Sequence, residues 1–339
     1  RDPLLKIDHN GCRDPGVGAE RTLDAEVAIH VSPGSLEEPV TVQPDRASRL
    51  DQGIVLGLVA GLIGWLLSRP APLPDAATAG LNGDAARGET VFWAAGCAAC
   101  HATPDSEGDA RLVLAGGYRI TSPFGTFVAP NISPSSAGIG GWSTQDLANA
   151  LIAGVSPAGR HYYPSLPYTT YARMTLQDVA DLKVFLDTLP PSDVASPPHE
   201  LSFPFTVRRG LGLWKQRYLN GDWVVPVEGE TLERGRYLVE ALGHCAECHT
   251  PRDAFGGLDS AQWLQGAPNP SGEGRIPGIA PSQLDWSAED IAYYLETGFT
   301  PDFDSAGGEM ADVIANLAHL SAEDRAAIAA YLKAVPEGQ

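Results

Sequence analysis

The chain has 339 residues, a formal net charge of −19, 28 prolines, 37 glycines and five cysteines. This length allows two or three domains with cores of their own, and the strong negative charge argues against a nucleic-acid-binding protein. Four of the five cysteines lie in two short motifs, so no disulfide framework is implied. The sequence shows no alternation of strand and helix patterns, so an α/β fold is not expected.

The first predicted segments are a polar extension and an apolar helix. Residues 1–50 show no sustained periodicity and predict a disordered extension, or upstream sequence absent from the mature protein. Residues 51–69 contain the uncharged run 53–67, which is intermediate between a signal-peptide core and a full membrane span. No small-residue cleavage site follows closely, so we expect an uncleaved transmembrane anchor. A cleaved signal and a buried helix are the alternatives.

Two copies of Cys-x-x-Cys-His, at residues 97–101 and 245–249, have the spacing that attaches c-type haem. Two thiols at this spacing reach the two vinyl groups of one porphyrin, and the adjoining imidazole lies under the iron. The motifs therefore predict two covalently attached haem c groups. The predicted haem-binding residues are Cys97, Cys100 and His101 in the first copy, and Cys245, Cys248 and His249 in the second. The alternative is one zinc ion shared by the four cysteines.

The chain from residue 84 onward reads as one pattern used twice. After a proline-rich tether over residues 70–83, we expect domains at 84–190 and 232–336, joined by a linker at 191–231. In each copy a helix leads into the motif, and a long loop follows it. A capped helix, a methionine and a closing helix complete the order. This is the order of a small, mainly α-helical cytochrome c domain.

Capping signals mark the later helices of both copies. Serine precedes a helical pattern in segments 141–147 and 285–291, with an acidic residue three positions later. Thr175 and Ser321 open the closing helices, which are expected to end before Pro190 and Pro336.

The sixth iron ligand is predicted from the scarcity of methionine. The chain has two methionines, Met174 and Met310, and each stands in the corresponding part of one copy. A thioether as second axial ligand raises the haem potential and fills the last coordination position. The predicted metal ligands are therefore His101 with Met174 and His249 with Met310, with His319 as a competitor for Met310.

The linker 191–231 combines prolines and aromatic residues with a group of basic residues. A packed interdomain linker is the simpler interpretation. The alternative is that Arg208 and Arg209 belong to a face that holds the two haems close together or docks a partner.

The first copy resembles a known family at residues 122–134, 138–142 and 162–171. These runs are similar to the cytochrome c subunits of membrane-bound bacterial alcohol, gluconate and fructose dehydrogenases. In that family the methionine ligand follows the Pro-Tyr-x-x-Tyr segment, which is where Met174 stands. The resemblance covers about residues 84–335 and is looser in the second copy. Those subunits carry three haems, whereas this chain has two motifs and is more similar to stand-alone dihaem c cytochromes.

The expected function is electron transfer, from a dehydrogenase to a terminal oxidase or a soluble cytochrome. Haem attachment to this motif takes place outside the cytoplasmic membrane. We therefore expect the chain on the periplasmic side of the bacterial inner membrane, anchored, or soluble after signal cleavage. The alternative is a dihaem enzyme, such as a peroxidase or a thiosulfate dehydrogenase. Such an enzyme needs an iron that opens a coordination position or a reactive cysteine, and the two domains contain no spare cysteine.

Overall fold

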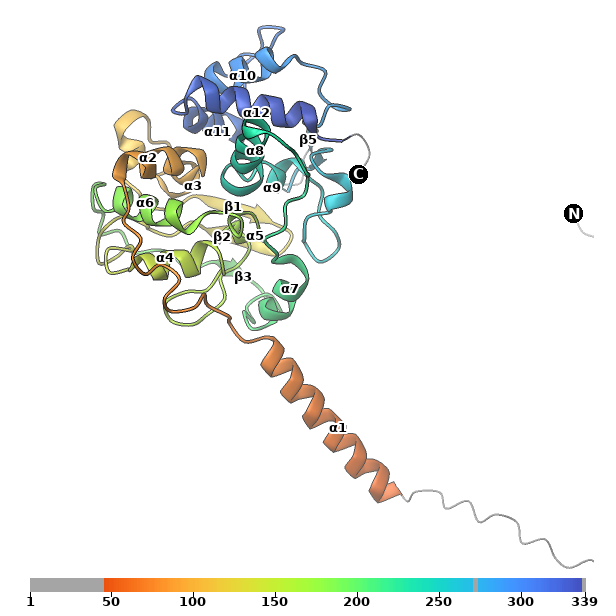
Figure 1. Cartoon of the computed structure of the whole chain (residues 1–339). Helices are drawn as coiled ribbons and strands as arrows, with labels where there is room; N and C mark the ends of the chain where they lie inside the picture. Colours follow the sequence, from red (N-terminus) through yellow and green to blue (C-terminus); the bar gives the residue numbers. More distant parts are fainter. Residues whose placement is uncertain (1–45, 271–273, 337–339) are drawn as a thin grey trace, which may run out of the picture. The chain divides into compact units, whose positions relative to one another are not determined.

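The computed structural model describes residues 46–270 and 274–336, so residues 1–45 of the predicted polar extension lie outside the described residues. The chain is mainly helical, as predicted (Figure 1). The elements of the first part are α1 (Arg46–Leu67), α2 (Ala85–Ala94), α3 (Cys97–His101), the 3-10 helix η1 (Gly108–Leu112), β1 (Arg119–Ser122), β2 (Gly125–Val128), α4 (Thr144–Leu151), α5 (Tyr168–Tyr171), α6 (Leu176–Leu186) and β3 (Glu200–Leu201). The elements that follow are α7 (Gly210–Tyr218), α8 (Glu230–Tyr237), the π-helix η2 (Leu238–Leu242), α9 (Ala246–His249), the 3-10 helix η3 (Ser260–Gln262), β4 (Ala267–Pro268), β5 (Arg275–Ile276), α10 (Ala288–Thr297), α11 (Glu309–Leu317) and α12 (Ala322–Ala334).

Each copy is closed by a pair of packed helices, α2 with α6 and α8 with α12 (Figure 1). The helices of each pair touch at a glycine. A Cβ on Gly88 would lie 2.0 Å from the Asp181 carbonyl oxygen, and a Cβ on Gly235 would lie 2.0 Å from the Ala327 carbonyl oxygen. Only a residue without a side chain allows two backbones to come this close. The same crossing therefore recurs in both copies, as expected from a repeated sequence pattern.

The predicted caps start four of these helices. The capping residues are Ser143 for α4, Thr175 for α6, Ser287 for α10 and Ser321 for α12. In α4 and α10 the acidic residue three positions on bonds back to the cap, which completes a capping box. Gly298 ends α10 in the left-handed conformation, with a φ of 78°.

A small antiparallel sheet, which the sequence patterns did not predict, joins the first copy to the segment that follows it. Strand β2 lies between β1 and β3, and Gly125 pairs with Leu201. Since β3 belongs to segment 191–231, the start of that segment is fixed to the first copy by backbone hydrogen bonds.

The two copies share one hydrophobic core. The buried cluster takes Phe92 and Trp93 from α2 and Leu238 and Leu242 from η2, and it continues through the closing helices of both copies. The described residues from Val55 onward accordingly form one compact unit. The two halves of the repeat are therefore packed against each other.

Basic residues of segment 191–231 bind carbonyl groups at the ends of helices. The Arg209 guanidinium donates to the Trp65 carbonyl oxygen at 2.6 Å, near the end of α1. The Lys215 ammonium donates to the Ala153 carbonyl oxygen at 2.7 Å, just after α4. The last carbonyls of a helix lack intrahelical partners and carry partial negative charge, so cations are stabilising there. Two of the basic residues of this segment, Arg209 and Lys215, therefore stabilise the fold.

Residues 70–83, predicted as a tether, are bonded to the first copy. The Leu73 amide donates to the Asn149 side chain at 2.8 Å, and Thr78 donates to Gln145 at 3.1 Å. These bonds fix the segment along α4 before α2 begins.

The apolar helix α1 exposes large side chains, among them Leu58, Leu62 and Trp65. Within residues 46–270 and 274–336, no helix combines the length and apolarity needed to cross a membrane. The transmembrane anchor predicted for residues 51–69 is thus not shown.

Candidate functional site

The first Cys-x-x-Cys-His motif forms the short helix α3, directly after α2. Gly96 makes the turn between the two helices, with a φ of 64° that favours glycine. The hydroxyl of the buried Tyr171 donates to the Ala95 carbonyl oxygen at 2.9 Å, which holds this turn from the other side. A backbone bond of 2.8 Å from the Gly116 amide to the His101 carbonyl oxygen fixes the end of α3.

The second motif is held in the same way. The Gly266 amide donates to the His249 carbonyl oxygen at 2.7 Å, as Gly116 does to His101 in the first copy. Gly116 and Gly266 both have positive φ, 74° and 82°. The repeat predicted from the sequence therefore extends to the backbone around both motif histidines.

Both motif histidines are oriented by a proline carbonyl. Nδ1 of His101 lies 2.8 Å from the Pro130 carbonyl oxygen, and Nδ1 of His249 lies 2.7 Å from the Pro277 carbonyl oxygen. A carbonyl only accepts, so Nδ1 carries the proton and Nε2 keeps a free lone pair. Burial also lowers the pKa of both imidazoles, although the carbonyl acts in the opposite direction. Two neutral imidazoles with fixed tautomers result, which is the arrangement typical of metal-ligating histidines.

The four motif cysteines are neutral thiols in this environment. Burial raises the pKa of Cys97 and Cys245 to about 12, and that of Cys100 and Cys248 to about 11. In the part of the chain that the structure describes, no three His, Cys, Asp or Glu side chains come together as a metal site. The geometry thus gives no support to the shared zinc site.

The two predicted methionine ligands lie in different surroundings. Met174 follows α5 and is 4% exposed, within the shared core. Met310 is half-buried in the first turn of α11 and packs against the same core. His319, the competitor for Met310, stacks on Trp93 of the other copy with ring centroids 3.7 Å apart.

These residues fit a c-type haem in each copy. Each motif supplies two neutral thiols and one neutral imidazole with a free Nε2, and each copy supplies one methionine packed into the core. Several buried polar atoms also lack a hydrogen-bond partner, among them Nε1 of Trp93 and Nε of Arg111 and Arg236.

The second cysteines of the two motifs, Cys100 and Cys248, share one electrostatic neighbour, Glu309. Beyond the effect of burial, Glu309 raises the pKa of both Cys100 and Cys248. Glu309 opens α11, which packs against α3 of the first copy. Sequence reasoning missed this proximity, because no signal in the repeat shows how its two copies pack.

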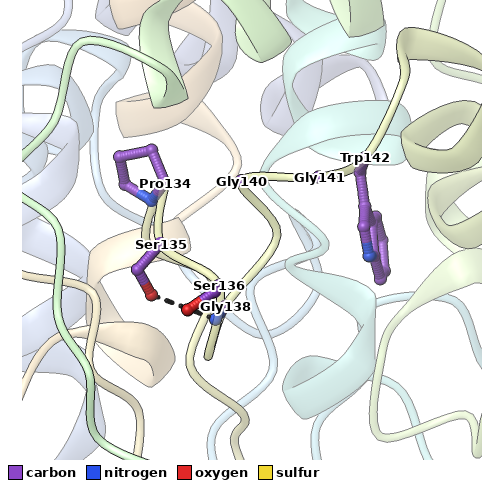
Figure 2. Close-up of a pocket in the computed structure, with 7 residues that line it drawn as sticks. All are labelled: Pro134, Ser135, Ser136, Gly138, Gly140, Gly141 and Trp142. Atoms are coloured by element: carbon purple, nitrogen blue, oxygen red, sulfur yellow. Dashed lines mark hydrogen bonds between the residues drawn. The ribbon is translucent and has the colours of Figure 1, made fainter.

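Two cavities lie outside the motifs. One, of about 560 Å³, is lined by residues of the loop from Pro134 to Trp142 (Figure 2). Another, of about 750 Å³, lies between Thr169, Trp214 and Trp263. Neither is lined by any of the eight residues predicted to bind haem.

Comparison with known proteins identifies a family model and several relatives that match this chain. Residues 85–190 match the family model for cytochrome c. The chain is 60% identical to a "Diheme cytochrome c-type" protein of Cereibacter sphaeroides, over 85% of this chain and 98% of that protein. It is 38% identical to the fructose dehydrogenase cytochrome subunit of Gluconobacter japonicus, over 74% of this chain and 52% of that subunit. It is 32% identical to the gluconate 2-dehydrogenase cytochrome c subunit of Pantoea cypripedii, over 74% of this chain and 59% of that subunit. The chain thus spans little more than half the length of these two dehydrogenase subunits.

Proposed function

This chain belongs to the dihaem c-type cytochromes, and on that premise we propose that it transfers electrons between a dehydrogenase and a terminal oxidase or soluble cytochrome. One observation carries the proposal. The motif that attaches haem c occurs twice, and in both copies a proline carbonyl holds the motif histidine in the tautomer that leaves Nε2 free. When bound, each haem supplies an iron that alternates between the ferric and ferrous states.

Each copy contributes its own set of residues to one haem. In the first copy, Cys97 and Cys100 would hold the haem through thioether bonds, and His101 and Met174 would bind its iron. In the second copy, the corresponding residues are Cys245, Cys248, His249 and Met310. Burial of Met174 in the shared core supports its role, because a buried thioether keeps water from the iron.

The protein's part in the reaction is positional and electrostatic. Pro130 and Pro277 hold the two imidazoles in one tautomer, so each Nε2 would be free to bind a haem iron. If histidine and methionine both bind the iron in each copy, no position is left at which a substrate would bind. A dihaem peroxidase or thiosulfate dehydrogenase is therefore not favoured, and it remains an outcome of the test described below.

We place the chain on the periplasmic side of the inner membrane, attached through the apolar run 53–67. Its uncharged sequence and exposed side chains support this placement. A donor dehydrogenase is supported by the relatives, which include cytochrome subunits of fructose and gluconate dehydrogenases.

The test is carbon monoxide binding to the reduced full-length protein, with the haem counted as pyridine haemochrome. We expect two haems per chain and no carbon monoxide spectrum. The variants M174L and M310L should each open one position and bind one carbon monoxide per chain. Ready binding by the unaltered protein would contradict the carrier function and favour an enzyme, with peroxide and thiosulfate as the first substrates to assay.

A further inference from the structure

The two copies differ in length just before their motifs. One more residue separates Gly235 from Cys245 than separates Gly88 from Cys97. Since both glycines occupy the same helix crossing and both cysteines start the same motif, the second copy must accommodate the extra residue between these points. It does so in η2, a π-helical turn that directly continues α8. A π-helical turn within a helix absorbs a single inserted residue and is frequent at functional sites.

The insertion brings His244 to the position directly before Cys245. The backbone of His244 has a φ of 41°, in the left-handed region that residues other than glycine rarely adopt. A non-glycine residue persists there only where the surrounding structure holds it in place. The residue before the first motif, Gly96, also has a positive φ, of 64°, but as a glycine it adopts this conformation without strain.

The His244 ring lies against the first copy, at the entrance to its motif. Its Nε2 is 3.4 Å from the position that a Cβ on Gly96 would occupy. Gly96 directly precedes Cys97, as His244 directly precedes Cys245. The ring also meets Tyr171 edge to face, with centroids 6.0 Å apart, and Tyr171 is itself bonded to the Ala95 carbonyl oxygen. The residues that lead into the two motifs therefore touch through one imidazole.

Burial lowers the pKa of His244, although Glu247 and nearby backbone groups act in the opposite direction. The ring is therefore neutral at physiological pH and packs against the first copy without carrying a charge into the interface. A neutral ring at this place is suited to close packing between the two attachment helices.

We propose that His244 is a positioning residue that fixes the two haem-attachment helices, α3 and α9, relative to each other and so sets the electronic contact between the two haem sites. This inference rests on the proposed function, because it takes the two motifs to carry the haems. It assigns a role to a residue that is neither an attachment cysteine nor an iron ligand.

The experiment compares H244A with H319A in the full-length, haem-loaded protein. His319 is a matched control, since its ring also packs across the two copies but on Trp93 instead of at the motifs. Three quantities are measured: the circular-dichroism couplet of the two Soret bands, the rate of electron exchange between the haems after pulsed reduction, and the free energy of unfolding. A further variant, H244Q, restores a side chain of similar reach.

We expect H244A to weaken the couplet and slow the exchange severalfold, H319A to leave both unchanged, and H244Q to recover part of the loss. An unchanged couplet and rate in H244A would overturn the proposal, and so would an equal loss in H319A. If H244A does not fold, H244Q provides the test. A weakened couplet in an H244Q protein of normal stability supports the positioning role. An unaltered couplet in H244Q contradicts it. Fewer than two haems in the unaltered protein would instead contradict the proposed function.

Discussion

Trp93 of the first copy and His319 of the second stack face to face, with ring centroids 3.7 Å apart and planes 2° from parallel. His319, which the sequence offered as an alternative to Met310 as an iron ligand, is thus part of the contact between the two copies. The stack joins α2 to the turn after α11, and it accounts for the position of a ring that the sequence left unexplained.

Replacing His319 should therefore affect stability and not the haem. H319A should lower the free energy of unfolding by about 0.5–1.5 kcal/mol, the range for an aromatic pair beyond its buried area. The visible spectra of both redox states should stay unchanged, because no iron ligand is lost. Spectra like those of M310L would show that His319 is the sixth ligand of the second haem.

The helix crossings should not tolerate any side chain. G88A and G235A each place a Cβ 2.0 Å from a carbonyl oxygen of the closing helix, so the two helices must separate. We expect each variant to lose about 1–3 kcal/mol of unfolding free energy or more, measured by denaturant titration. G141A is the matched control, since its Cβ would meet nothing within 4 Å. Equal stability of G88A and G141A would contradict the close crossing.

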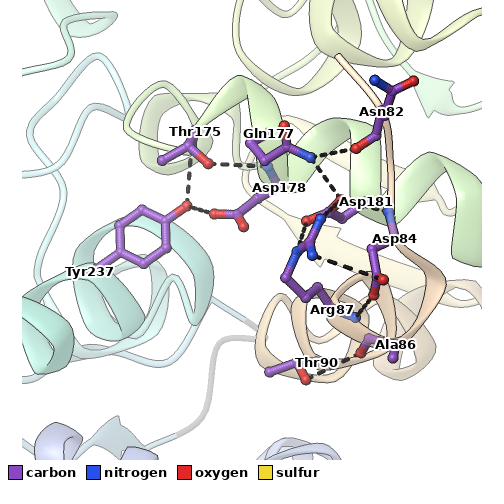
Figure 3. A network of polar contacts seen from close by, with 10 residues as sticks. All are labelled: Asn82, Asp84, Ala86, Arg87, Thr90, Thr175, Gln177, Asp178, Asp181 and Tyr237. Atoms are coloured by element: carbon purple, nitrogen blue, oxygen red, sulfur yellow. Dashed lines mark hydrogen bonds and ion pairs between the residues drawn. The ribbon is translucent and has the colours of Figure 1, made fainter.

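A hydrogen bond between the copies should contribute measurably to stability. The Tyr237 hydroxyl of α8 donates to the Asp178 carboxylate of α6 and accepts from the Thr175 amide (Figure 3). In the second copy the corresponding acid, Asp324, instead binds Arg234 of its own copy. Y237F should cost about 1.5 kcal/mol, the low end for a bond to a charged group, because both residues are partly exposed.

The matched control for Y237F is T90V, at the corresponding position of α2. Thr90 bonds only weakly, at 3.5 Å, to the carbonyl of Ala86 in its own helix (Figure 3). Denaturant titration of the two variants is the measurement. If T90V lowers the free energy of unfolding as much as Y237F does, the hydrogen bond between Tyr237 and Asp178 makes no specific contribution to stability.

The protein should lose stability at alkaline pH. Burial together with a neighbouring carboxylate raises the pKa of Tyr237, beside Asp178, and of Tyr331, beside Glu240. A raised pKa in the folded state means that the stabilising contribution is complete below the unfolded value, about 10. It is lost as the pH rises through the folded values, because the unfolded state then releases its protons first.

Denaturant titrations between pH 8 and pH 11 measure this dependence. The free energy of unfolding should be nearly constant up to about pH 10 and then fall, following the unperturbed tyrosine pKa. Y331F should flatten the alkaline decrease. A decrease of the same slope in Y331F would contradict the assignment to this phenol.

The end of α1 should become mobile when Arg209 is removed. Its guanidinium binds the Trp65 carbonyl and the Ser68 hydroxyl, at 2.6 and 2.9 Å, and it also lies over the Trp65 ring. R209A should speed amide hydrogen exchange in residues 65–69 of the full-length protein. R160A, at an exposed arginine, is the control. Exchange as slow in R209A as in R160A would show that the helix end does not depend on this contact.

Local patterns in the sequence determined much of this protein. The spacing of Cys97, Cys100 and His101, repeated at residues 245–249, predicted haem attachment, and the comparisons confirm a dihaem cytochrome. The caps at Ser143 and Ser287 predicted where two helices begin, and both are confirmed. These features depend on bonds and contacts between residues a few positions apart, so a linear pattern is enough to specify them.

Only the tertiary structure decided how the copies meet. The proline carbonyls that orient His101 and His249, the bond from Tyr237 to Asp178 and the contact of His244 with Gly96 join residues far apart in the chain. The repeat gives both copies one fold, yet each copy is equally compatible with several ways of packing against the other. The choice among them follows from shared burial of apolar surface and from single departures, such as the residue inserted before Cys245.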